Sequence, residues 1–149
     1  LREQDIFDLD NGKSDKKYIP VDDDEVNSYI ENVLSKIKYP YQNDSMPNVK
    51  ELIRDLFLSK AKMHERLNRI NLIPDMDVFI MIGDENINIL SAKKSNGKIE
   101  CTLDLRLLRK ILDRKSYWNN AEIGGHIELN RSPNYYSPDI HTALQFLHL

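Results

Sequence analysis

The sequence predicts an α+β domain in which helices pack on a mainly antiparallel sheet. Before Pro74, apolar residues recur every three or four positions, and after it the period falls to about two. The last third, from Lys98 to Leu149, follows the order strand, helix, turn, strand, helix. We therefore expect two N-terminal helices, a short Leu-rich helix and a C-terminal helix around one sheet. A length of 149 residues suits one domain.

The first 20 residues form a polar arm or linker, and residues 21–149 form the domain. The arm has apolar residues at Ile6, Phe7 and Leu9, followed by a strong turn signal at Asn11-Gly12. This pattern predicts a short strand that docks on the sheet of the domain or on an upstream domain. Because the chain begins at Leu1 rather than Met, we expect it to be a processed chain or a piece of a longer polypeptide.

Two helices are expected before Pro74. Acidic residues 22–25 cap the first, since carboxylates favour a helix N-terminus, and Pro40 ends it near Lys38. Its apolar stripe is Val26, Tyr29, Ile30, Val33, Leu34 and Ile37. The second begins after Asn48 as N-cap, and one wide face carries Val49, Leu52, Ile53, Leu56, Phe57, Lys60, Met63, Leu67 and Ile70.

Three strands with short turns are expected next, at 76–82, 87–92 and 98–104, in an antiparallel meander. Gly83-Asp84 and Asn96-Gly97 supply the turns. Asp104 caps the Leu-rich helix 105–112. After it we expect a short helix that includes Ala121, Glu122 and Ile123, a strand from His126 to Arg131, and a last helix that begins at Ser137 or Asp139.

Composition excludes several classes of protein. The net charge of −3 without a Lys/Arg run gives no reason to bind nucleic acid. No stretch approaches the roughly 20 apolar residues of a membrane span. The single cysteine, Cys101, alternates with Ile99 and Leu103, which predicts a buried thiol rather than a nucleophile. The lack of disulfides fits a reducing, cytoplasmic location.

Signatures of catalysis and metal binding are missing from the sequence. His126, Glu128, His141 and His148 could converge on zinc, but their spacing matches no zinc motif. We therefore predict no metal, no cofactor and no catalytic residue. A hypothesis of an independent enzyme that uses His126, Glu128 and His141 is therefore weaker than the two non-catalytic hypotheses given below.

The aromatic segment 117–120 has two interpretations. An interface or a sugar-like ligand would suit this segment, with the residues Tyr117, Trp118, Asn119 and Asn120, then Tyr135 and Tyr136. Alternatively, Trp118 packs under the sheet while both asparagines cap a helix containing Ala121, Glu122 and Ile123, and the usual burial of Trp favours this. If the segment faces a partner or ligand, the residues expected at that edge are Trp118, Asn119, Asn120, His126 and Tyr136.

The residues KIECTLDLRLLRKILDRKSYWNNAEIGGHIELN, followed by HTALQFLHL, resemble the end of sterol-carrier-protein-type domains. More narrowly, LREQDIFDLDNG and WNNAEIGGHIELNRSPNYYSPDIHTALQFLH resemble the C-terminal extension of some bacterial metallo-β-lactamase-fold hydrolases. The metal-binding His-x-His-x-Asp-His cluster of those hydrolases is absent, so the resemblance implies an accessory domain rather than the catalytic one.

The resemblance leads to two hypotheses about function. In the first, the chain is a non-catalytic C-terminal domain that packs on an upstream metallo-β-lactamase-fold domain or mediates assembly into a homo-oligomer. In the second, it is a carrier that binds a lipid or another apolar small molecule in an internal pocket. The residues expected to line that pocket are Leu105, Leu108, Leu112, Leu144 and Leu147.

Overall fold

The computed structural model describes residues 7–8, 13–14, 22–33, 36 and 38–149. It divides the chain into two compact units, Leu1–Tyr39 and Pro40–Leu149. Each unit is described by itself below.

The first unit contains a strand pair and a helix. Strand β1 (Phe7–Asp8) pairs antiparallel with β2 (Lys13–Ser14). The expected arm strand is therefore present, whereas Ile6, Leu9 and the Asn11-Gly12 turn lie outside the described residues.

Helix α1 (Asp23–Asn32) begins as predicted, because the Asp22 carboxylate accepts a hydrogen bond from the amide of Asp24 at 3.2 Å. It ends earlier than predicted, with Val33 as C-cap; Leu34 and Ile37 lie outside the described residues. None of the residues of α1 is buried.

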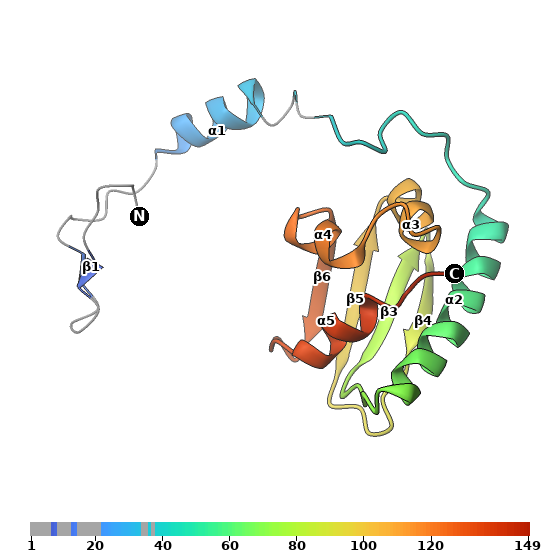
Figure 1. Ribbon diagram of the computed structural model, residues 1–149. Coiled ribbons are helices and arrows are strands. Elements are labelled where there is room, and N and C mark those ends of the chain that lie inside the picture. The colour runs from blue at the N-terminus through green and yellow to red at the C-terminus, as the bar shows by residue number, and fades with distance from the viewer. Residues whose placement is uncertain (1–6, 9–12, 15–21, 34–35, 37) are drawn as a thin grey trace. The chain divides into compact units, whose positions relative to one another are not determined.

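The second unit is a four-stranded mixed sheet with helices on one face, which confirms the α+β class (Figure 1). The strands are β3 (Asp77–Ile82), β4 (Glu85–Leu90), β5 (Lys98–Leu103) and β6 (Ile127–Ser132), in the order β4-β3-β5-β6. The helices are α2 (Val49–Arg69), α3 (Leu105–Leu112), α4 (Trp118–Ile123) and α5 (Pro138–Leu144).

The predicted antiparallel meander of the first three strands is wrong. β3 and β4 form the expected hairpin, but β5 crosses to the other side of β3 and pairs with it in parallel. The segment 91–97 makes this crossing. Its end is held beside β3 by a hydrogen bond of 2.9 Å from the amide of Asp77 to the carbonyl of Gly97. A Cβ at Gly97 would lie only 2.3 Å from the carbonyl oxygen of Ser132, so glycine is required there by close approach rather than by a hairpin turn.

The core lies between the helices and one face of the sheet. Side chains alternate across each strand, so Val78, Ile80 and Ile82 of β3 are buried and their neighbours are less so. Cys101 is fully buried in the same layer, as predicted, and burial raises the pKa of its thiol to about 12. The thiol is thus held neutral and behaves as a small apolar side chain.

The predicted starts of α2 and α3 are correct. The Asn48 side chain accepts from the amides of Lys50 and Glu51, and the Asp104 side chain accepts from the amide of Arg106. The expected apolar face of α2 is only partly covered. Leu52, Leu56, Met63 and Leu67 are buried, whereas Val49, Phe57 and Ile70 remain exposed.

The loop from β6 to α5 is held by one carboxylate. Asp75 accepts hydrogen bonds from the hydroxyls of Tyr135 at 2.7 Å and Ser137 at 2.8 Å, and these bonds hold the pKa of Asp75 below its usual value. Ser137 is the N-cap residue of α5, as one of the two predicted starts proposed, but its hydroxyl binds Asp75 instead of capping the helix.

The Asp75 anchor predicts a pH-dependent contribution to stability. Its pKa is lowered, so the stabilisation is present above the ordinary aspartate pKa near ~3.9 and is lost as the pH falls through that value toward the folded pKa. At pH 7, Asp75→Asn should lower the free energy of unfolding by about 1–3 kcal/mol, because an amide accepts fewer hydrogen bonds than a carboxylate.

Urea denaturation of both proteins from pH 7 downward would measure this difference. We expect the gap in unfolding free energy to narrow once the pH falls below the ordinary aspartate pKa. A gap that stays constant across this range would contradict the anchoring role of the ionised carboxylate.

Candidate functional site

Helix α4 contains Trp118, Asn119 and Asn120 of the predicted edge residues, and two of its side chains hold it against the core. Trp118 and Ala121 face the core and are 1% and 3% exposed. The helix ends where Gly125 adopts a φ of +70°, which allows the amide of His126 to donate to the carbonyl of Ala121 at 2.8 Å. Gly125 therefore supplies the left-handed backbone conformation at which the chain turns out of α4.

The proposed capping role of Asn119 and Asn120 is wrong. Tyr117 is the N-cap residue of α4 and makes no side-chain capping bond, and both asparagines lie inside the helix with exposed side chains. Since Trp118 and Ala121 take the inward face, the outward face is left to Asn119, Asn120 and Ile123. Together with Tyr117 we call these residues the α4 face.

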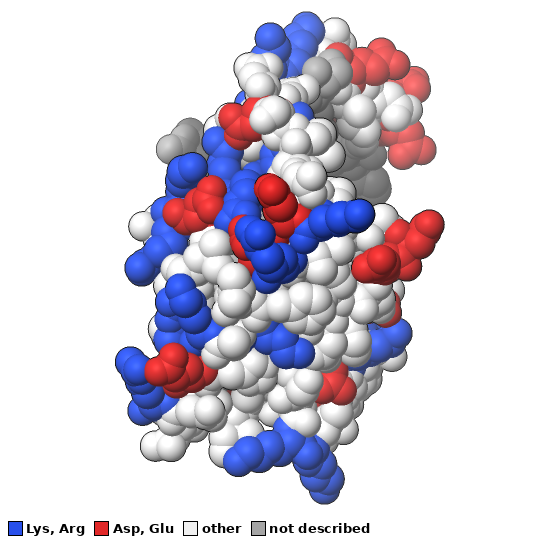
Figure 2. Space-filling view, turned by 90° about the vertical axis from the view of Figure 1, so that its right-hand side faces the viewer, with Lys and Arg blue, Asp and Glu red and all other residues white. Residues whose placement is uncertain are grey.

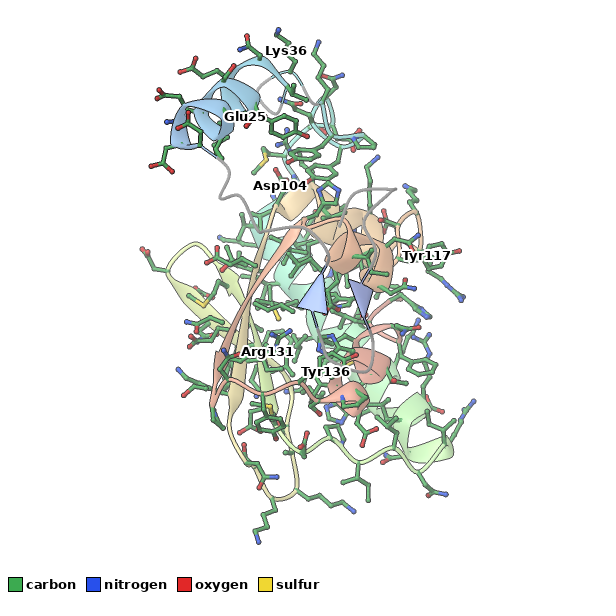
Figure 3. All side chains as sticks on the ribbon, turned by 90° about the vertical axis from the view of Figure 1, so that its left-hand side faces the viewer. Glu25, Lys36, Asp104, Tyr117, Arg131 and Tyr136 are labelled. Carbon is green, nitrogen blue, oxygen red and sulfur yellow. The ribbon has the colours of Figure 1, made fainter. Side chains whose placement is uncertain are left out.

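A buried contact fastens α4 to α5. Nδ1 of His141 lies 2.5 Å from the carboxylate of Glu122, and Tyr136 stacks on the His141 ring with 4.6 Å between centroids. The side chain of His141 is 11% exposed and that of Glu122 is 21% exposed. This contact fixes Tyr136 beside α5, whereas Tyr117 lies apart from it near α4 (Figure 3).

On the other side of α4, Asn120 and His126 line a surface pocket of about 270 Å³. The Tyr41 hydroxyl is 3.1 Å from Nδ1 of His126, and the two rings meet edge to face. Lys110 and Lys115 also line this pocket, which contains no carboxylate in its wall. We call it the Asn120 pocket.

The charges near the Asn120 pocket are paired. Lys110 lies 2.8 Å from the Asp44 carboxylate, and Lys115 lies 3.3 Å from that of Asp113. Arg106 holds Asp104 through two hydrogen bonds and lowers the pKa of that carboxyl. The pocket therefore carries polar groups but little uncompensated charge.

The five predicted edge residues do not converge on one site. Trp118 is in the core, Asn120 and His126 share the Asn120 pocket, Asn119 points outward, and Tyr136 lies on the His141 ring. Ile123 was expected in this helix but not at the edge that faces a partner, and at 86% it has the highest exposed fraction among the large hydrophobic residues described as exposed. Its spacing of three from Asn120 on a short helix was the available signal.

The five leucines expected to line an apolar pocket pack in or against the core. Leu108, Leu112, Leu144 and Leu147 are at most 1% exposed, and Leu105 is partly buried. Three surface pockets of the described part are lined by both polar and apolar residues and a fourth by polar and charged residues, and Leu147 alone among these leucines lines one of them.

The histidines and Glu128 that might have formed a metal or catalytic site lie in different surroundings. His126 contacts Tyr41, His141 pairs with Glu122, and His148 lies against Arg66. Glu128 is exposed, and its strand neighbours Ile127 and Leu129 belong to or pack against the core. Within residues 22–33, 36 and 38–149 and the two short strands, no group of three potential ligands is close enough to hold a metal ion.

Comparisons with protein-family models, with curated proteins and with solved structures found no significant match for this chain. None of the helices in the described part of the chain is both long and apolar enough to cross a membrane.

The burial of Trp118 predicts a structural role that substitution can measure. Trp118→Ala should lower the free energy of unfolding by about 3–5 kcal/mol, because it leaves a large cavity in the core. Tyr117→Ala is the matched control, since the neighbouring ring is 60% exposed and its loss should have little effect. Equal losses from the two substitutions in chemical denaturation would contradict this assignment.

Proposed function

We propose that this chain is a non-catalytic accessory domain of a metallo-β-lactamase-fold hydrolase and that the α4 face docks on the catalytic domain. The observation that carries the proposal is the exposure of Ile123 at 86% and Tyr117 at 60% on a helix that is otherwise firmly held. Apolar side chains presented this way are common at protein interfaces.

The surroundings of the α4 face support docking. Trp118 anchors one side of α4 in the core, and the Glu122–His141 contact fastens it to α5. A rigid helix loses little conformational entropy on binding, which leaves more of the interaction energy for affinity. Beside it, the Asn120 pocket offers an amide and an imidazole that could hydrogen-bond a partner side chain.

The carrier alternative has less support. Its expected lining residues contact one another and the sheet inside the core, and an apolar ligand would have to displace them. For the location of the protein, the single buried cysteine supports a reducing compartment such as the cytoplasm.

Site-specific photo-crosslinking in the producing cell would test the docking proposal. A p-benzoylphenylalanine residue at position 123 should crosslink to a metallo-β-lactamase-fold domain, either in the same polypeptide or in another. The same residue at position 94, on an exposed loop, should not give that product. Crosslinking of position 123 only to unrelated proteins, or equal capture from both positions, would contradict the proposal.

Substitution of Ile123 should separate docking from folding. Ile123→Asp should weaken binding to the catalytic domain at least about tenfold, since a charge would be buried at the interface. The free energy of unfolding should change by less than about 0.5 kcal/mol because the side chain is exposed. Ile73→Asp is the matched control, since this isoleucine is 57% exposed at the far end of α2. Isothermal titration calorimetry would report affinity, and urea denaturation would report stability.

A further inference from the structure

A second surface pocket lies where the end of α3, the start of α4 and the end of α5 meet. Its volume is about 230 Å³, which is below the roughly 300–1,000 Å³ of pockets that hold drug-sized ligands. Ile111 and Leu147 supply apolar walls, and Tyr117 and Phe146 supply aromatic ones. A pocket of this size and lining suits a small ligand with an apolar or aromatic body.

The polar side chains of this pocket can all donate hydrogen bonds, and one of them is a cation. Arg114, His148, Gln145 and Ser116 line it, and none of its lining residues is acidic. Unlike the lysines of the Asn120 pocket, Arg114 has no carboxylate partner among the described residues. A guanidinium beside an amide and a hydroxyl matches the hydrogen-bonding needs of a carboxylate or phosphate group.

Further positive charge lies behind this rim. Arg66 donates to the carbonyl oxygens of Phe146 and His148, both at 2.9 Å. Burial lowers the pKa of His148, and the charges of Arg66, Arg114 and Lys62 lower it further. Glu65, the acidic residue next to Arg66 in the sequence, pairs instead with Arg69 on the exposed side of α2. Figure 2, which views the α2 side of the molecule, shows Lys and Arg side chains spread over this face with acidic groups among them.

The backbone of Arg114 gives a second, independent observation. Its φ is 59°, in the left-handed region that strains residues other than glycine, at the position after the α3 C-cap where glycine is usual. The amides of Lys115 and Ser116 both donate to the carbonyl of Lys110. These bonds close the turn after α3 and fix the backbone position of Arg114. Helix termination alone would be better served by glycine, which points to a use for the side chain.

We propose that this pocket binds a small organic anion, with its carboxylate or phosphate group against Arg114 and its apolar body between Tyr117 and Phe146. The pocket shares Tyr117 with the α4 face, but Ile123, at which docking is tested, does not line it. Loss of anion binding in Arg114→Gly would therefore leave docking through Ile123 unchanged.

The test is a titration of the 149-residue chain with benzoate, phenyl phosphate and the uncharged benzyl alcohol at constant ionic strength. Trp118 lines the pocket and is the single tryptophan of the chain, so its fluorescence and its indole N–H resonance report binding there directly. We expect a saturable change with benzoate or phenyl phosphate and at least about tenfold weaker binding of benzyl alcohol, as loss of a charged hydrogen bond predicts. The preferred anion distinguishes a carboxylate from a phosphate ligand.

Arg114→Gly is the decisive variant, because it removes the cation and also relieves the left-handed backbone. It should weaken anion binding at least about tenfold while thermal stability stays equal or rises. Asn71→Gly relieves a similar φ of 52° elsewhere, and Lys94→Gln removes a charge on a distant loop; both should bind as the parent does. Unchanged binding by Arg114→Gly, equal binding of benzyl alcohol, or no saturable change with either anion would overturn the proposal.

Discussion

Burial of one face of the sheet beneath four helices is the interaction on which the rest of the second unit depends. The buried layer contains Val78, Ile80, Ile99 and Cys101 from the two central strands, each at most 1% exposed. Such burial contributes on the order of 25 cal/mol for each Å² of apolar surface removed from water. Because all four helices use this single face, each of them has its position set by the same layer.

Helix α4 illustrates how that layer positions the proposed docking surface. It has six residues, too few for an isolated helix to be stable in water. Trp118 in the core and Glu122 against His141 hold it from two directions, so its remaining side chains face outward. The exposed Ile123 therefore belongs to a fixed surface. The same contacts fix the residues of α4 that line the two neighbouring pockets.

Local features of the fold could be predicted from the sequence because they depend on near neighbours. The change of period at Pro74 marked the first strand of the sheet, Asn48 and Asp104 marked helix starts, and alternation around Cys101 predicted its burial. The parallel pairing of β5 with β3 could not be predicted in this way. It depends on backbone hydrogen bonds between segments about 20 residues apart, from the amide of Asp77 to the carbonyl of Gly97 and from the amide of Asn96 to the carbonyl of Asp75.

The candidate sites were harder to predict for the same reason. The polar-aromatic composition of segment 117–120 indicated α4 as a place of interest, but which side chains turn inward depends on the helix register against the core. The pocket proposed to bind an anion at Arg114 takes its lining from three different places in the chain. Arg114 follows α3, Tyr117 precedes α4, and Phe146 and His148 follow α5. Nothing in the local sequence of Arg114 links it to His148, which the fold brings close through α5.

The anchoring of residues 146–149 has a consequence for the order of events during synthesis. Arg66 on α2 binds the carbonyl of Phe146, 80 residues later in the chain, and the amide of Leu149 donates to the carbonyl of Leu112. Leu147 between them is 1% exposed and belongs to the core. The helix α2 thus leaves the ribosome long before the segment that completes its packing. The part of α2 that packs on α5 stays uncovered in the nascent chain until residues 138–149 emerge, although β4 and α3 can cover other parts of it earlier, and exposed apolar surface in this interval is what chaperones bind.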